Sequence, residues 1–168
     1  FPEETHQINS TGFIEVLNLS RLMDVETFIY ASSCAVYGDN KIFPLCENLL
    51  TFPKSPYAAS KLSNEAYGSG FADISSKMKI IGLRFFNIYG PWQDCNSGYA
   101  AVIPKWISTL IKGHKPIIYG DGNSTRDYCY VENLCKAIYL IANKKNLSNN
   151  EIFNIGTGIE TRLNDLYD

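Results

Sequence analysis

The stretch TFIYASS, residues Thr27–Ser33, decides the fold. It is short, mostly apolar and rich in β-branched and aromatic residues, which is typical of a buried strand in a parallel sheet. A long helix is predicted from Pro56 to about Ser75, and KIIGLRFF, Lys79–Phe86, is predicted to be the next buried strand. Strand, helix and strand at this spacing indicate a βαβ unit, so we expect an α/β fold with a parallel sheet.

Further elements are predicted on both sides of this unit. Apolar residues at helical spacing predict helices at Ile8–Met23, Val102–Lys112 and Val131–Asn143, and Gly113 is placed to end the second of these. The segments PIIYG at 116–120 and IFNIG at 152–156 are predicted as short strands. We therefore expect two regions, 1–90 with the sheet and 91–168 as a smaller, truncated α/β region.

Composition limits the partners and the compartment. The 168 residues have a net charge of -2, which gives no electrostatic basis for binding nucleic acid or an anionic membrane surface. No apolar run approaches the ~20 residues needed to cross a bilayer. The five cysteines form no C-x-x-C pair and lie far in sequence from histidine. We therefore expect no metal site, and reduced thiols in a cytoplasmic protein.

The segment SPYAASK, residues 55–61, places a phenol and an ammonium one helical turn apart. Ser55 suits the helix N-cap and Pro56 the first helical position, so Tyr57 and Lys61 should share one face at the helix start. The ammonium and the positive helix end favour a phenolate, which could exchange a proton with a substrate hydroxyl. Such pairs also occur as a packed ring beside a solvated charge, so the pair by itself does not establish catalysis.

Two serines, Ser32 and Ser33, end the first predicted strand. They lie at the carboxyl edge of the sheet, where open α/β folds bind ligands. Ser33 could therefore converge with Tyr57 and Lys61. For Ser32, a hydroxyl bonded to the backbone is as good an interpretation as a contact to substrate.

Four segments, in order, resemble the extended short-chain dehydrogenase/reductases, and most closely the nucleotide-sugar epimerases. They are ASSCAVYG at 31–38, SPYAASK at 55–61, LRFFNIYGP at 83–91 and GDGNSTRDYCYVENL at 120–134. The resemblance implies the C-terminal part of a Rossmann-like parallel sheet plus a smaller α/β substrate-binding region. Residues 1–90 would then be a remnant of the dinucleotide-binding domain that carries the catalytic residues, and residues 91–168 a truncated substrate-binding region. It also implies NAD as cofactor and a UDP-hexose or UDP-N-acetylhexosamine as substrate. The segment at 93–106 is most similar to UDP-N-acetylglucosamine 4-epimerases of bacterial surface-polysaccharide pathways.

The resemblance assigns roles to residues. Tyr57 would be the acid/base, Lys61 would lower its pKa and bind the nicotinamide ribose, and Ser33 would bond the sugar O4 in a transient oxidation at C4 to a 4-keto sugar. Phe86 would touch the nicotinamide end through its backbone. The substrate-binding positions implied are Ser32, Ser33, Tyr57, Asn87, Ala101, Val102, Trp106, Tyr119 and Arg126. Without the family context, Asn87 could be a turn residue, Val102 and Trp106 core residues, and Arg126 a surface partner of Asp127.

The chain also departs from the family pattern. Cys34 and Ala35 stand where dehydratases carry an acidic pair, which favours an epimerase over a dehydratase and over the decarboxylating relatives, although a dehydratase or reductase of the same fold remains an alternative. The glycine-rich NAD-binding turn is missing, because the triplets at 68, 120 and 156 have the wrong context. We therefore expect the chain to be a fragment of a longer enzyme and to bind NAD weakly by itself. The resemblance implies a homodimer for the full-length parent. An inactive truncated product is the alternative, and the sequence leaves open whether the sugar is N-acetylated.

Overall fold

The computed structural model describes residues 1–74, 77–96 and 100–167, and it divides into two compact units. Unit 1 comprises Phe1–Phe85 with Ile138–Ile155, and unit 2 comprises Phe86–Ala137 with Gly156–Asp168. The sequence had placed residues 138–155 in the second region. They return to unit 1 because the strand at their end pairs with the sheet. The roles assigned to the two regions remain predictions.

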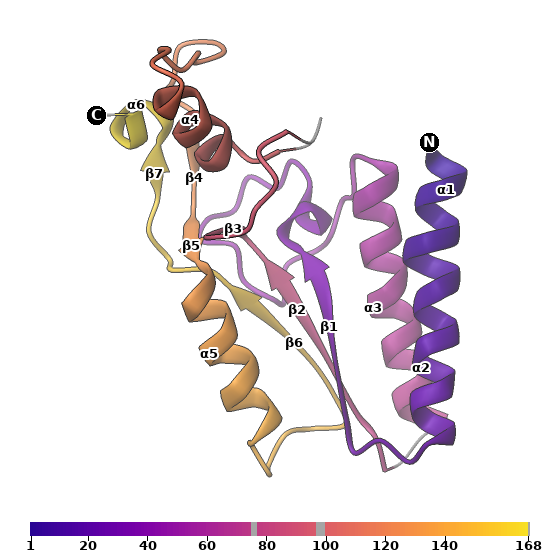
Figure 1. Cartoon of the computed structure of the whole chain (residues 1–168). Helices are drawn as coiled ribbons and strands as arrows, with labels where there is room; N and C mark the ends of the chain where they lie inside the picture. The colour runs from indigo at the N-terminus through magenta and orange to yellow at the C-terminus, as the bar shows by residue number, and fades with distance from the viewer. Residues whose placement is uncertain (75–76, 97–99, 168) are drawn as a thin grey trace. The chain divides into compact units, whose positions relative to one another are not determined.

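Unit 1 contains a parallel sheet of β1 (Thr27–Ser33), β2 (Lys79–Phe85) and β6 (Asn150–Ile155), in the order β1-β2-β6 (Figure 1). The central strand β2 is buried at five consecutive positions, as expected for a strand that is covered on both faces. The predicted α/β class and the βαβ unit are therefore confirmed.

Two long helices run side by side in unit 1 (Figure 1). The first is continuous over α1 (Pro2–His6), a π-helical turn (Gln7–Thr11) and α2 (Gly12–Leu22), so it begins earlier than predicted. The second is α3 (Pro56–Ile74), and its predicted end at Ser75 lies outside the described residues. The two helices are joined by a hydrogen bond between the Ser10 and Ser63 hydroxyls at 3.0 Å. The core below them contains Leu17, Tyr30, Ala72, Met78 and Ile80.

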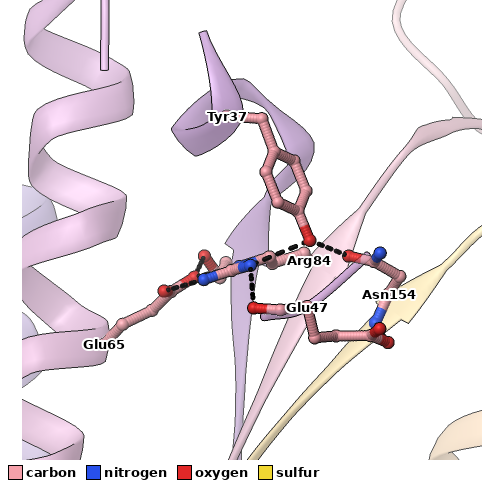
Figure 2. Close-up of polar contacts among 6 residues, drawn as sticks. Tyr37, Glu47, Glu65, Arg84 and Asn154 are labelled. Carbon is pink, nitrogen blue, oxygen red and sulfur yellow. Dashed lines mark hydrogen bonds and ion pairs between the residues drawn. The ribbon is translucent and has the colours of Figure 1, made fainter. Parts of the chain in front are cut away.

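An ion pair between Arg84 of β2 and Glu65 of α3 lies inside unit 1, with 4% and 5% of the two residues exposed (Figure 2). Arg84 donates from Nε to Glu65 Oε1 at 2.9 Å and from Nη2 to Oε2 at 2.7 Å. The same carboxylate accepts a hydrogen bond from the Ser32 hydroxyl at 2.5 Å. The pair therefore joins α3 to both β1 and β2 with bidentate geometry.

The remaining donor of Arg84 extends this network. Its Nη1 donates to Tyr37 Oη at 2.8 Å and to the Glu47 carbonyl at 3.2 Å, and Tyr37 donates to Asn154 Oδ1 at 2.7 Å (Figure 2). Burial raises the pKa of Tyr37, so its phenol keeps the proton that it donates. Burial alone would lower the pKa of Arg84, but its hydrogen bonds to Glu65 and Tyr37 raise it overall. The guanidinium thus stays charged.

Unit 2 is built from short elements. β3 (Asn87–Tyr89) pairs in parallel with β5 (Tyr128–Tyr130), and β4 (Thr125–Arg126) pairs in antiparallel with β7 (Thr161–Arg162). Its helices are α4 (Val102–Ile111), the first part of α5 (Val131–Ala142) and α6 (Leu163–Tyr167). The sequence predicted α4 and α5 but missed β3, β4, β5 and β7, because strands of two or three residues leave too little pattern to detect.

Two further predictions have clear outcomes. Gly113 ends α4 with φ +76°, and its N–H donates to the Leu110 carbonyl at 2.9 Å, as predicted. The predicted strand PIIYG at 116–120 is wrong, because this segment forms no strand and pairs with no described strand. Its side chains Ile117 and Tyr119 are 65% and 87% exposed.

Across the described residues, no helix has both the length and the apolar character needed to span a membrane.

The buried ion pair gives a test of the fold. Changing Arg84→Ala strands the Glu65 carboxylate in the interior, and we expect the free energy of unfolding in urea to fall by about 3–5 kcal/mol. The matched control is Lys54→Ala, which breaks the exposed pair of Lys54 and Asp39, whose side chains are 62% and 72% exposed. This control should change the free energy by less than about 1 kcal/mol. Equal losses of unfolding free energy in the two variants would contradict the assignment of Arg84 and Glu65 as a buried ion pair.

Candidate active site

Ser33 lies at the carboxyl end of β1 and caps the 3-10 turn η2 (Cys34–Tyr37). Its Oγ accepts a hydrogen bond from the Ala35 N–H at 3.2 Å, and the residue is 8% exposed. Among the described residues, the Ser33 hydroxyl proton has no acceptor. Ser33 therefore keeps one donor available for a ligand at the end of the sheet.

Tyr57 and Lys61 lie in the first turns of α3, as predicted. Ser55 caps the helix by accepting a hydrogen bond from the Ala58 N–H at 3.1 Å. Tyr57 is 46% exposed, and Lys61 Nζ lies 5.8 Å from the centroid of its ring, within the range of a cation–π contact. Lys61 Nζ also donates to the Ala31 carbonyl of β1 at 3.1 Å. Burial lowers the pKa of Lys61.

These contacts bring part of the predicted set together. The start of α3 lies at the same end of unit 1 as the carboxyl ends of β1 and β2 (Figure 1). The bond from Lys61 to Ala31 ties the helix to the strand two residues before Ser33. Ser33, Tyr57 and Lys61 thus belong to one end of one unit, with a hydroxyl, a phenol and an ammonium available for chemistry.

Ser32 has a different environment from the one expected for a substrate contact. It is 2% exposed, and its hydroxyl proton is donated to Glu65. It does not bond to the backbone either, which was the alternative interpretation. The geometry supports a role for Ser32 in the buried network and gives no support to a contact with substrate.

In unit 2, Phe86 and Asn87 are held by backbone contacts. The Phe86 carbonyl accepts from the Ile88 N–H at 2.9 Å. The Asp127 carbonyl accepts from the Asn87 main-chain N–H at 3.1 Å and from Asn87 Nδ2 at 3.0 Å. Asn87 therefore holds β3 against β5, and its side-chain oxygen is the group that remains for a ligand.

A cavity of about 570 Å³ lies in unit 2, and Trp106 of α4 lines it. Trp106 packs edge-on against Tyr167, with ring centroids 5.6 Å apart. Burial raises the pKa of Tyr128, another lining residue, so its phenol stays neutral. The size and the aromatic lining are those of a small-molecule site. The lining residues are Tyr89, Ile103, Trp106, Ile107, Leu110, Pro116, Tyr128, Thr157, Ile159, Thr161, Leu166 and Tyr167.

The other predicted substrate residues of unit 2 do not line this cavity. Ala101 is the N-cap residue of α4, and Val102 is its first residue. Tyr119 is 87% exposed. Arg126 is exposed and donates from Nη1 to the Thr125 carbonyl at 2.6 Å. Its guanidinium makes no ion pair with Asp127 in the part of the chain that the structure describes, so that alternative is not observed.

The glycine triplets show how far the chain fits NAD. The turn at Gly156–Gly158 has N–H groups that face a carboxylate: Thr157 N donates to Asp127 Oδ1 at 2.9 Å, and Gly158 N donates to Oδ2 at 2.8 Å. A Cβ at Gly156 would lie 2.6 Å from Asp127 Oδ2, so any other residue there would displace this carboxylate. This turn cannot cradle a phosphate while Asp127 fills it. Among the described residues, this turn therefore offers no free N–H groups for the diphosphate of NAD, and the contact of Lys61 with the nicotinamide ribose stays a prediction.

Sequence reasoning missed three structural residues near these sites. Glu65 follows Tyr57 and Lys61 at the same four-residue spacing, and Arg84 is a charge inside an otherwise apolar strand. Both were signals that a buried charge needs a partner. Asp127 was considered only as a partner of Arg126, because its contact with the turn at 156–158 spans 30 residues of sequence.

Comparisons with known proteins identify the family of the chain. The family model described as "NAD dependent epimerase/dehydratase family" matches residues 1–156. The chain is 42% identical over 162 residues to a putative UDP-glucose 4-epimerase of Methanocaldococcus jannaschii, which covers 96% of this chain and 51% of the relative. It is 32% identical over 153 residues to the human dTDP-D-glucose 4,6-dehydratase, which covers 91% of this chain and 42% of that protein.

A solved structure is similarly close. The UDP-N-acetylglucosamine 4-epimerase of Methanobrevibacter ruminantium M1, in complex with UDP-N-acetylmuramic acid, matches with a TM-score of 0.91 and 39% identity. The match covers 96% of this chain and 51% of that one. The chain thus spans about half the length of the relatives that it matches, and its sheet is the corresponding part of a Rossmann-like fold. With the family model matched over most of its length, the chain belongs to the NAD-dependent epimerase/dehydratase family.

Proposed function

We propose that Ser33, Tyr57 and Lys61 form the catalytic part of a UDP-sugar 4-epimerase that acts by transient oxidation at C4. The observation that carries the proposal is the arrangement of Ser33, Tyr57 and Lys61 at one end of unit 1, with Lys61 anchored to β1 at 3.1 Å. The relatives with UDP-sugar 4-epimerase activity in their names support the substrate class.

The proposed chemistry is a reversible proton exchange. The Tyr57 oxygen accepts the proton of the sugar 4-hydroxyl as C4 is oxidised, and it returns the proton when the 4-keto sugar is reduced on its other face. Ser33 donates its unshared proton to the sugar O4. Tyr57 must be a phenolate before it accepts the sugar proton and again after it has returned it, and Lys61, whose Nζ lies 5.8 Å from the centroid of the Tyr57 ring, stabilises that negative charge.

NAD, when bound, supplies the hydride acceptor and then the hydride donor. Lys61 would hold the hydroxyls of the nicotinamide ribose, and the Phe86 backbone would contact the nicotinamide end. In unit 2, Asn87 and Arg126 supply polar groups for the sugar nucleotide, and a guanidinium suits a diphosphate. The positions Ala101, Val102 and Tyr119 stay in the proposed substrate set on the family resemblance alone.

The cavity in unit 2 is proposed to take the uracil or ribose of the substrate. Its volume of about 570 Å³ fits a group of that size, and Trp106 offers an aromatic face for stacking on a base. We propose UDP-hexose or UDP-N-acetylhexosamine as the substrate. The resemblance of residues 93–106 favours UDP-N-acetylglucosamine and a place in polysaccharide biosynthesis.

A dehydratase of the same fold is the second candidate, because a dehydratase is among the relatives. The residues after Ser33 weigh against it, since Cys34 and Ala35 offer no carboxyl group for removing water from a sugar. An inactive product is the third candidate. Incubation of the whole protein, as its gene encodes it, with NAD and UDP-sugars distinguishes the three: a C4 epimer, a 4-keto-6-deoxy product, or neither.

The whole protein is also proposed to be a cytoplasmic homodimer that pairs through the two long helices of unit 1. None of the five cysteines, all of which the structure describes, forms a disulfide, which fits a reducing compartment. Large apolar side chains are exposed along both helices, as a helix-to-helix interface needs. They are Ile8, Val16, Leu19 and Leu22 on the first helix, and Tyr67 and Ile74 on α3.

The role of Tyr57 is tested by Tyr57→Phe in the whole protein. Loss of the proton-exchanging oxygen should lower kcat for C4 epimerisation by about 10³-fold, measured by NMR of the UDP-sugar mixture. The matched control is Tyr67→Phe, since Tyr67 lies on the same helix and is 43% exposed against 46% for Tyr57. Full activity in Tyr57→Phe would refute the assignment.

The role of the cavity is tested by Trp106→Ala. Loss of the stacking face should raise the KM for the UDP-sugar by about tenfold and leave kcat nearly unchanged, because a single base–aromatic contact contributes roughly 1–3 kcal/mol. Trp92→Ala is the control, since Trp92 is fully exposed. An unchanged KM in Trp106→Ala would show that the nucleotide binds elsewhere.

The fit to NAD is tested by calorimetry on the 168-residue chain alone. We expect weak binding, because the 168 residues contain no glycine-rich turn in the right context to hold the NAD diphosphate, and the turn at 156–158 is filled by the Asp127 carboxylate. The whole protein is the positive control and should bind NAD tightly. Tight binding by the 168-residue chain would contradict this expectation.

A further inference from the structure

We infer that Glu65 is a positioning residue for the proposed reaction, which holds the first turns of α3 in register with the end of β1 through Ser32 and Arg84. The inference rests on the proposed function in one respect: that function identifies the side chains that must be aligned, namely those of Tyr57 and Ser33. Its physical basis is a set of contacts in unit 1 alone.

Tyr57, Lys61 and Glu65 follow one another at four-residue intervals, so they share one face of α3. Two of them hold consecutive residues of β1. Lys61 donates to the Ala31 carbonyl at 3.1 Å, and Glu65 accepts from the Ser32 hydroxyl at 2.5 Å. The helix cannot slide along the strand or rotate on it without breaking both bonds. The place of Tyr57, one turn further along the same face, is therefore fixed relative to β1.

Ser33 is held from both sides by the same ion pair. Ser32, directly before it, bonds to Glu65, and Tyr37, at the end of the turn that Ser33 caps, accepts from Arg84 Nη1 at 2.8 Å. The ion pair of Glu65 and Arg84 thus fixes the positions of both the Ser33 hydroxyl and the Tyr57 phenol.

A purely stabilising role explains these contacts less well. A buried ion pair contributes little net stability compared with apolar residues of similar volume, because desolvation offsets its attraction. What the pair does supply is direction: Glu65 Oε1 accepts from both Ser32 and Arg84 Nε, and Oε2 accepts from Nη2. Directional bonds of this kind lock side chains in place, and a misplacement of 1 Å can lower a rate by about 100-fold.

The test uses the whole protein, as its gene encodes it, with the milder variant Ser32→Ala and the near-isosteric Glu65→Gln. Each should lower kcat for C4 epimerisation by at least tenfold while KM for the UDP-sugar stays within about twofold. Because both act through one contact, the double variant should lose no more than the worse single variant. A raised KM, or losses that multiply in the double variant, would overturn the inference, since these would indicate separate roles such as a direct contact of Ser32 with substrate.

The matched control is Ser10→Ala. Ser10 is fully buried in the same unit, and its hydroxyl bonds to Ser63 Oγ at 3.0 Å, where α3 contacts the first helix. It removes one buried hydroxyl bond, as Ser32→Ala does, without touching Glu65. We expect kcat to be unchanged in this control. A loss of kcat equal to that of Ser32→Ala would reduce the effect to general destabilisation and overturn the inference.

Amide hydrogen exchange separates this inference from the proposed function. In Ser32→Ala and Glu65→Gln, the amides of residues 58–61 should exchange at least tenfold faster than in the unchanged protein, and they should keep their rates in Ser10→Ala. If the unchanged protein does not epimerise UDP-sugars but these amides respond as expected, the proposed function fails and the positioning stands. If the amides do not respond, the positioning fails whatever the activity.

Discussion

The buried ion pair of Arg84 and Glu65 is the contact on which the arrangement of unit 1 depends. Arg84 uses three nitrogens to reach the Glu65 carboxylate, the Tyr37 phenol and the Glu47 carbonyl. Through these groups, and through the bonds of Ser32 and Asn154, the helix α3 is joined to all three strands of the sheet. A buried charge is tolerated only when it is paired and hydrogen-bonded, and here Nε, Nη1 and Nη2 of Arg84 each donate a hydrogen bond.

This constraint explains why the candidate catalytic groups lie on different elements yet keep a defined relation. Ser33 ends a strand, and Tyr57 and Lys61 begin a helix, so their alignment depends on how the helix is set against the strand. Apolar packing alone permits small sliding movements. The bonds of Lys61 to Ala31 and of Ser32 to Glu65 are directional and remove that freedom. The sheet thus fixes the position of the groups that we propose for proton exchange at its carboxyl edge.

Unit 2 uses the same kind of device on a smaller scale. The Asp127 carbonyl accepts a hydrogen bond from the Asn87 side chain. The Asp127 carboxylate accepts hydrogen bonds from the N–H groups of Thr157 and Gly158. Asp127, which lies between β4 and β5, therefore connects β3 to the turn after β6. The same contact explains why the glycine triplet at 156 does not serve as a phosphate-binding turn: an internal carboxylate already occupies the site that an anion would take.

Much of the fold could be predicted from local pattern. The buried strands at 27–33 and 79–85, the capped start of α3 at Ser55, and the end of α4 at Gly113 each follow from residues within one turn or one strand. The candidate set of Ser33, Tyr57 and Lys61 was found because spacing along a helix and position at a strand end are local properties. The short strands of unit 2 were missed, and a strand at 116–120 was wrongly predicted, because strand formation depends on a distant partner.

The sequence by itself determined the fold class, the family resemblance and the residues with chemistry to offer. Only the tertiary structure decided that Ser32 serves Glu65, that Arg84 and Tyr37 complete the network, and that Asp127 fills the turn at Gly156. The physical reason is separation along the chain. Helix caps and buried strands are specified by neighbours in sequence, whereas the partner of a buried charge lies dozens of residues away and becomes known only when the chain is folded.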